Sequence, residues 1–170
     1  MSEYIIEMRD ITKDFPGIRA NDRVTLQLRR GEIHALLGEN GAGKSTLMNI
    51  IAGVFKPTEG SIFVRGEQVV FHSPYDAIQK RIALIHQEPL IFSDLDIAEN
   101  IFAGHTRKSG RRTVSWKDIY RQAQELLDSL EVQLDPKRVM KNMSIADQQM
   151  VEIVSALSQN AQVIIMDEPT

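Results

Sequence analysis

Nine consecutive residues, Gly38–Thr46, have the types and spacing needed to bind a chain of phosphates. They read GENGAGKST and satisfy the pattern GxxxxGK[ST]. Glycines let the backbone wrap closely around phosphate, and a helix that begins near Ser45 would direct free amides and its positive dipole end at the anion. We expect Lys44 to reach the β- and γ-phosphates, Ser45 to complete a magnesium shell and Thr46 to contact the α-phosphate. The predicted binding residues of this loop are Gly38, Asn40, Gly41, Ala42, Gly43, Lys44, Ser45 and Thr46.

Two adjacent carboxylates, Asp167 and Glu168, follow the apolar run Val163–Met166. A parallel sheet would deliver them to the same carboxyl edge as the glycine loop. Asp167 would then hold magnesium through its water shell, and Glu168 would polarise a water for in-line attack on the γ-phosphorus. An isolated Asp-Glu pair is more often a solvated strand end, so the catalytic interpretation depends on Lys44 upstream.

The elements that must position these residues follow from apolar spacing. Segments 4–8 and 24–28 are predicted as antiparallel strands, with turn residues at Pro16-Gly17. The nearly unbroken apolar run Ile33–Leu37 predicts a strand buried on both faces of a sheet. Helical spacing from Ser45 to Gly53 predicts the helix after the glycine loop. Further strands are predicted at 61–64, 69–71, 82–86 and 163–166, and a helix at 74–81.

The texture changes to helical periodicity between 97 and 158, interrupted by the polar stretch 106–113. One predicted stripe runs from Ile119 to Leu130, and Ser144 is the expected N-cap of the next helix. The second stripe consists of Ala146, Met150, Ile153, Val154 and Leu157. We therefore expect an α/β core made of 1–87 and 161–170, with a helical subdomain at 88–160.

Composition is that of a globular chain with no general affinity for polyanions. The 170 residues carry a net charge of −3, with 42% hydrophobic residues and no cysteine. The basic stretch 107–112 has only Trp116 as a nearby aromatic, so a solvated loop is favoured and no nucleic-acid partner is expected. An acidic N-terminus and the lack of a run approaching ~18 apolar residues predict a soluble chain that is not exported.

The order of these motifs resembles the nucleotide-binding subunits of ATP-binding-cassette (ABC) transporters over nearly the whole chain. Walker A would be Gly38–Thr46, Walker B Val163–Glu168, the Q-loop Gln87 and the signature Met143–Gln149. The resemblance implies a P-loop NTPase (RecA-like) α/β core with an antiparallel β subdomain and a helical insert, binding ATP and Mg²⁺.

The resemblance also implies roles for single residues. Gln87 would touch magnesium and the attacking water, while Phe15 would stack on adenine; a structural role for Phe15 in the strand turn stays open. Ser144 would bind the γ-phosphate of ATP held by a facing cassette, or serve only as an N-cap. The signature differs from the common LSGGQ at every place except Ser144, and the methyl group of Ala146 limits close backbone approach.

The amino-acid sequence is most similar to those of importer ATPases for simple sugars such as ribose, xylose, galactose and rhamnose. The segments that carry this similarity are 15–18, 34–40, 97–102 and 147–153. That branch implies the first of two cassettes in one chain, a permease pair, a periplasmic or surface sugar-binding protein, and a peripheral place on the cytoplasmic face of the cell membrane. The alternatives are of four kinds. They are a nucleoside or autoinducer-2 importer, an ABC ATPase of DNA repair or translation, a cassette that binds ATP but hydrolyses it poorly, and a small-molecule kinase.

The chain stops before the D-loop and switch histidine that the family would place next. We therefore expect an N-terminal fragment of a cassette. Since the resemblance implies that each catalytic site combines residues of two cassettes, this fragment alone should hydrolyse little ATP.

Overall fold

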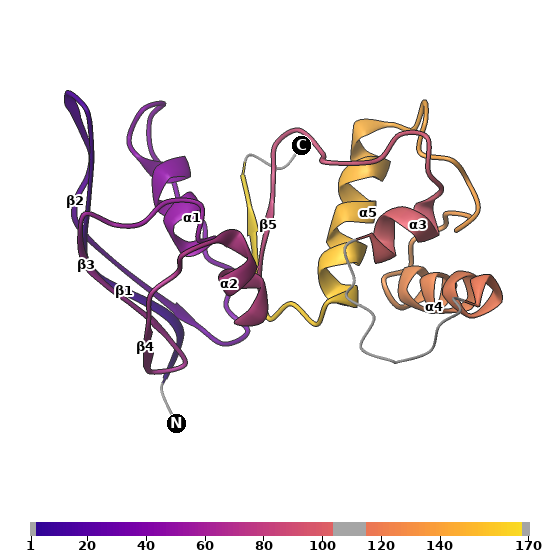
Figure 1. The fold of residues 1–170 in the computed structure, drawn as a ribbon, viewed down its shortest axis with the longest axis horizontal. Helices are drawn as coiled ribbons and strands as arrows, with labels where there is room; N and C mark the ends of the chain where they lie inside the picture. Colours follow the sequence, from indigo (N-terminus) through magenta and orange to yellow (C-terminus); the bar gives the residue numbers. More distant parts are fainter. Residues whose placement is uncertain (1–2, 104–114, 168–170) are drawn as a thin grey trace. The chain divides into compact units, whose positions relative to one another are not determined.

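A computed structural model describes residues 3–103 and 115–167 and contains two compact units, Met1–Leu84 and Ile85–Thr170 (Figure 1). The predicted solvated loop at 107–112 and the predicted catalytic Glu168 lie outside the described residues. The predicted grouping of 161–170 with 1–87 stays a prediction.

The first unit is built on an antiparallel sheet of four strands in the order β2-β1-β3-β4. These strands are β1 (Tyr4–Phe15), β2 (Ile18–Arg29), β3 (Glu59–Val64) and β4 (Glu67–Val69). The two predicted N-terminal strands are confirmed and extend until they meet at Pro16-Gly17, where Gly17 has a φ of 82°.

The predicted strand at 69–71 is mostly wrong, because β4 ends at Val69. Arg65 and Gly66 both have positive φ, at 54° and 84°, as a tight two-residue hairpin turn requires. This turn pairs Ile62 with Val69 in the final ladder position. Phe71 is buried, 4% exposed, but outside the ladder.

Two helices complete the first unit, α1 (Lys44–Ile51) and α2 (Pro74–Gln79). Both were predicted, α2 with its start after Ser73. Gly53, with a φ of 74°, ends α1 where a Cβ would lie 2.6 Å from the carbonyl oxygen of Ser73. The core of this unit combines apolar side chains of strands and helices: Ile6, Met8, Ile11, Leu47, Ile50, Ile51, Ile62, Val64, Phe71 and Ala77.

The predicted buried strand Ile33–Leu37 is wrong for the described structure. The segment has no strand assignment, and Ile33 and Leu37 are 100% and 88% exposed. An apolar strand of this kind needs a neighbour for its backbone and cover on both faces. Neither described sheet includes these residues, so the apolar run lacks that support.

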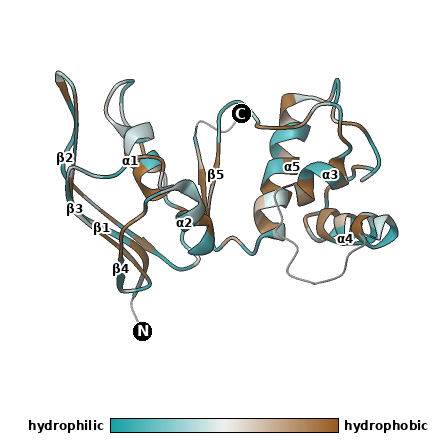
Figure 2. Ribbon diagram, in the orientation of Figure 1, coloured by the Kyte–Doolittle hydropathy of each residue, from teal (hydrophilic) through white to brown (hydrophobic). Residues whose placement is uncertain are grey.

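The second unit contains α3 (Ile97–Phe102), α4 (Trp116–Ser129), α5 (Ile145–Ser158) and β6 (Val163–Met166). Strand β5 (Ile82–Ile85) reaches the division between the units, and β5 and β6 form a two-stranded sheet. The helices share one apolar cluster, and Figure 2 shows hydrophobic faces on all three. Its buried members are Ile97, Ala98, Ile101, Ala123, Leu127, Met140, Met143, Val151 and Val154. Within the described residues, no helix is both long and apolar enough to cross a bilayer.

The predicted stripe of α4 is confirmed in its centre, since Ala123 and Leu127 are fully buried. The predicted stripe of α5 is only partly right. Val154 is buried as expected, but Ala146 is exposed and Gln149 is buried instead. The inward face of α5 therefore includes a polar side chain, whose amide reaches the backbone of Gln87.

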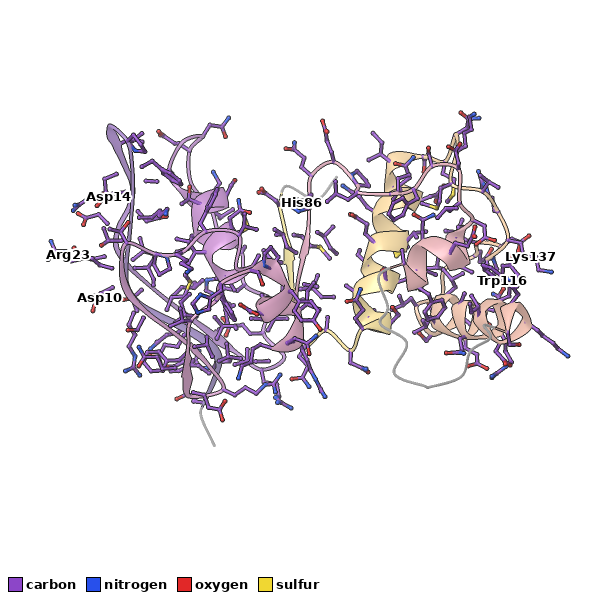
Figure 3. All side chains as sticks on the ribbon, in the orientation of Figure 1. Asp10, Asp14, Arg23, His86, Trp116 and Lys137 are labelled. Atoms are coloured by element: carbon purple, nitrogen blue, oxygen red, sulfur yellow. The ribbon has the colours of Figure 1, made fainter. Side chains whose placement is uncertain are left out.

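Asp96 links the start of α3 to α4. Its carboxylate accepts hydrogen bonds from the Glu99 amide at 2.8 Å and from the Tyr120 hydroxyl at 2.7 Å, although Asp96 is only 8% exposed. The hydrogen bond to Asp96 raises the pKa of the Tyr120 phenol. Lys137 covers the Tyr120 ring at 5.2 Å, and Trp116 lies beside it (Figure 3).

We predict that Asp96→Ala destabilises the second unit by about 2–4 kcal/mol, because it removes a helix cap and leaves the Tyr120 hydroxyl without its acceptor. Urea unfolding followed by circular dichroism would measure the loss. The exposed neighbour Asp94 supplies the control, since Asp94→Ala should change the free energy of unfolding by less than about 0.5 kcal/mol. Similar losses in the two variants would contradict the role of Asp96.

Candidate functional site

The glycine loop leads directly into α1, and Lys44 folds back across it. The Ala42 amide closes a turn on the Glu39 carbonyl at 3.1 Å. The Lys44 ammonium donates to the carbonyl oxygens of Gly38 and Glu39 at 2.8 and 2.9 Å. Residues 38–42 are exposed, so the loop places a fixed positive charge where solutes can reach it.

Gly43 fixes the end of this loop against β2. Its φ is 87°, and a Cβ added there would lie 2.2 Å from the Ala20 carbonyl oxygen and 2.7 Å from Nδ2 of Asn21. Asn21 Nδ2 also donates to the Gly43 carbonyl at 3.2 Å. Only glycine combines this backbone conformation with so close an approach.

Asn21 is a site residue that sequence reasoning missed. It is 6% exposed, and its Oδ1 is buried without a hydrogen-bond partner among the described residues. No local signal marked Asn21, which lies outside the predicted strand 24–28 and whose partner is a backbone carbonyl on a loop 22 positions away. Only the tertiary structure identifies that contact.

The N-terminus of α1 is suited to an anion. Its N-cap is Gly43, which has no side chain to cap the helix, and its first turn contains no acidic residue. Every other described helix begins after Ser or Asp and has an acid in its first turn. The first amides of α1, the Lys44 ammonium and the exposed Ser45 therefore lie together in one turn that carries no negative side chain.

Phe15 lies at the end of β1, where its ring meets the edge of Phe55 at a centroid distance of 5.4 Å. The Lys13 ammonium stands over the Phe15 ring at 4.9 Å and donates to the Lys56 carbonyl at 2.9 Å. These contacts give Phe15 the packing role that was one of the two expectations for it. Stacking on adenine stays a prediction and would use a ring that already has a cation over it.

In the second unit, the structure brings Gln87 and Asp167 to the ends of paired strands. The Asp167 amide donates to the Ile85 carbonyl at 3.2 Å, so Asp167 lies beside the end of β5. Gln87 follows that strand after His86 (Figure 3). The Gln87 carbonyl in turn accepts from the Gln149 side chain at 3.4 Å.

Ser144 begins α5 as predicted, since its hydroxyl accepts from the Asp147 amide at 3.1 Å. The N-cap interpretation is thus confirmed, while a contact with a facing γ-phosphate stays a prediction. Ile145 is 60% exposed and Ala146 is exposed, so these two departures from the common signature lie on the surface of the helix start, whereas Met143 is buried in the apolar cluster. Gly38–Thr46 belongs to the first unit and Gln87, Ser144 and Asp167 to the second, and their union in one site stays a prediction.

The family model described as "ABC transporter" matches residues 21–170. The chain is 49% identical over 168 residues to a putative ribose/galactose/methyl galactoside import ATP-binding protein of Halalkalibacterium halodurans, covering 98% of this chain and 32% of that protein. A xylose import ATP-binding protein of Geobacillus kaustophilus is 44% identical over 172 residues, covering 100% of this chain and 34% of that protein. The chain thus spans about a third of the length of these curated relatives.

Solved structures agree with these matches. A nucleotide-free ATP-binding cassette from an ABC transporter superposes with a TM-score of 0.84 at 25% identity, covering 98% of this chain and 70% of that one. Another cassette, solved in its ADP conformation, gives a TM-score of 0.83 at 26% identity, covering 99% of this chain and 70% of that one. The predicted fold, a P-loop ABC ATPase cassette with an antiparallel β subdomain and helical insert, is therefore confirmed.

We predict that Gly43→Ala weakens binding of Mg-ATP by at least about a hundredfold, because the new methyl group must displace the loop from the Ala20 carbonyl. Gly41 is the matched control: its φ is 84°, but a Cβ there would meet nothing within 4 Å. Gly41→Ala should introduce only the strain of a left-handed residue, about 1–2 kcal/mol. Its affinity for Mg-ATP should fall by about tenfold or less. Titration with a fluorescent ATP analogue would compare them, and equal losses would exclude the steric explanation.

Proposed function

The chain belongs to the ABC transporter family, and we propose that it is the first ATP-binding cassette of an importer ATPase, which binds Mg-ATP at Gly38–Thr46. The observation that carries this proposal is the loop pinned by Gly43, which sets the Lys44 ammonium and the uncapped start of α1 side by side. A polyphosphate needs such a combination of backbone amides and one cation.

Magnesium fits the oxygen donors that these residues offer. Ser45 is an exposed residue in the first turn of α1, while Gln87 and Asp167 follow the ends of β5 and β6. Hydroxyl, amide and carboxylate oxygens suit this hard cation, which uses few protein ligands and completes its shell with phosphate and water. When bound, Mg²⁺ neutralises charge that develops on the phosphate oxygens.

We assign the chemical step to residues that act on water. Glu168 would accept a proton from the attacking water, Gln87 would orient that water, and Lys44 would hold the transferred phosphoryl group. Ser144 and the start of α5 would serve the nucleotide of a facing cassette. Hydrolysis would then require a second cassette, in the same longer chain or in a dimer.

We propose that the transported solute is a simple sugar, because relatives of this chain are named as import ATP-binding proteins for ribose, galactose and xylose. Nucleoside or autoinducer-2 import is the alternative, since the solute itself would contact a permease and a periplasmic or surface binding protein. A permease partner at the cytoplasmic face of the membrane is supported by the exposed apolar residues that follow Gln87. Leu90 and Phe92 are 71% and 59% exposed.

We predict that Lys44→Ala, in the whole ATP-binding protein, abolishes or severely weakens nucleotide binding, whereas Glu168→Gln retains binding and loses turnover. Lys44 contacts charge present in the ground state, but Glu168 acts only in the chemical step. Equilibrium binding of Mg-ATP and steady-state phosphate release would separate the two effects. An equal loss of ATP affinity in both variants would contradict the assignment.

A further inference from the structure

Helix α5 holds the segment that carries Gln87 at two points. The Gln149 side chain donates to the Gln87 carbonyl at 3.4 Å, and Oε1 of Glu152 accepts from the Leu90 amide at 2.8 Å. Gln149 and Glu152 are three residues apart and therefore lie on the same face of α5. The hydrogen bond from Leu90 is the shorter of the two. Its acceptor is a carboxylate, which is a stronger acceptor than a backbone carbonyl.

The carboxylate of Glu152 is half-buried and incompletely satisfied. Its Oε2 is shielded from solvent and has no hydrogen-bond partner among the described residues. Burial raises the pKa of Glu152, while the Leu90 amide and nearby His86 act in the opposite direction. Partial burial of a carboxylate removes hydrating water and is unfavourable by itself. The stabilising contribution of Glu152 is therefore its hydrogen bond to the Leu90 backbone.

The segment that Glu152 holds has little other support near Leu90. Leu90 is 71% exposed, so its side chain does not anchor it, and Pro89 before it has no amide proton. Further along, the Asn100 side chain bonds both the amide and the carbonyl of Phe92, at 2.8 and 3.1 Å. Glu152 therefore fixes the half of this segment that lies next to Gln87.

We infer that Glu152 is a positioning residue for Gln87, an inference that rests on the proposed ATPase function. Helix α5 begins after Ser144, about 12 Å along its axis from Glu152 at the usual rise per residue. One rigid helix thus joins the predicted signature to the backbone of the Gln87 segment. Loss of the hydrogen bond at Leu90 should misplace Gln87 without touching the nucleotide itself.

The test uses the whole ATP-binding protein assembled with its permease, and compares Glu152→Ala with Glu152→Gln. Glutamine keeps an oxygen that can accept from the Leu90 amide, whereas alanine does not. We expect Glu152→Ala to lower kcat by about tenfold or more with the KM for ATP within about twofold, and Glu152→Gln to restore kcat to within about threefold. Glu125→Ala, at an exposed position of α4, is the matched control and should leave both constants unchanged.

Hydrogen exchange gives a readout that does not depend on turnover. The Leu90 amide should exchange faster in Glu152→Ala and near the wild-type rate in Glu152→Gln, while Val151 and Val154 in the helical core keep their protection. Unchanged exchange at Leu90, equal kcat in the two variants, or a loss of protection throughout the core would overturn the positioning role. Wild-type protein without Lys44-dependent hydrolysis would instead refute the proposed function, and the exchange rates would still decide whether Glu152 holds Leu90.

Discussion

The carbonyl oxygen of Ala20 leaves no room for a side chain at position 43, and the shape of the glycine loop depends on this contact. Gly43 takes a left-handed conformation there and becomes the N-cap of α1. The helix therefore starts with Lys44, directly after the point where the loop touches β2. A bulkier residue at position 43 would push the loop away from β2. The first amides of α1 would then no longer lie directly after the loop.

The starts of α1 and α5 show how capping decides what a helix end can do. At α5, the Ser144 hydroxyl already accepts from an amide, and Asp147 adds a carboxylate to the first turn. At α1, neither a capping side chain nor an acid is present. The Ser144 hydroxyl and the Asp147 carboxylate compete with an incoming anion for the positive N-terminal end of α5. The starts of α1 and α5 therefore differ in their electrostatic potential. The glycine loop is the stronger site for phosphate on these grounds.

Local signals in the sequence predicted the elements that are determined by local chemistry. Pro16-Gly17 marked the turn between β1 and β2, Gly53 the end of α1, and Ser144 the start of α5. The apolar run Ile33–Leu37 failed because burial of a strand depends on neighbours that a local pattern does not contain. Asn21 was missed for a related reason, since its partner Gly43 is distant in the sequence.

The inward face of α5 could not be predicted from hydrophobic spacing because this helix has a second task besides packing. The stretch between β5 and α3 pairs with another segment at the isolated bridge of Asp96 with Val139, and polar side chains of α5 bond other backbone groups of this stretch and of the end of α3. Glu152 accepts from Leu90, and Ser155 donates to the Ile101 carbonyl at 3.0 Å. A helix that satisfies backbone groups must turn polar residues inward beside its apolar ones. For this reason the buried Gln149 stands where the stripe alone would place an apolar residue, next to the backbone of Gln87.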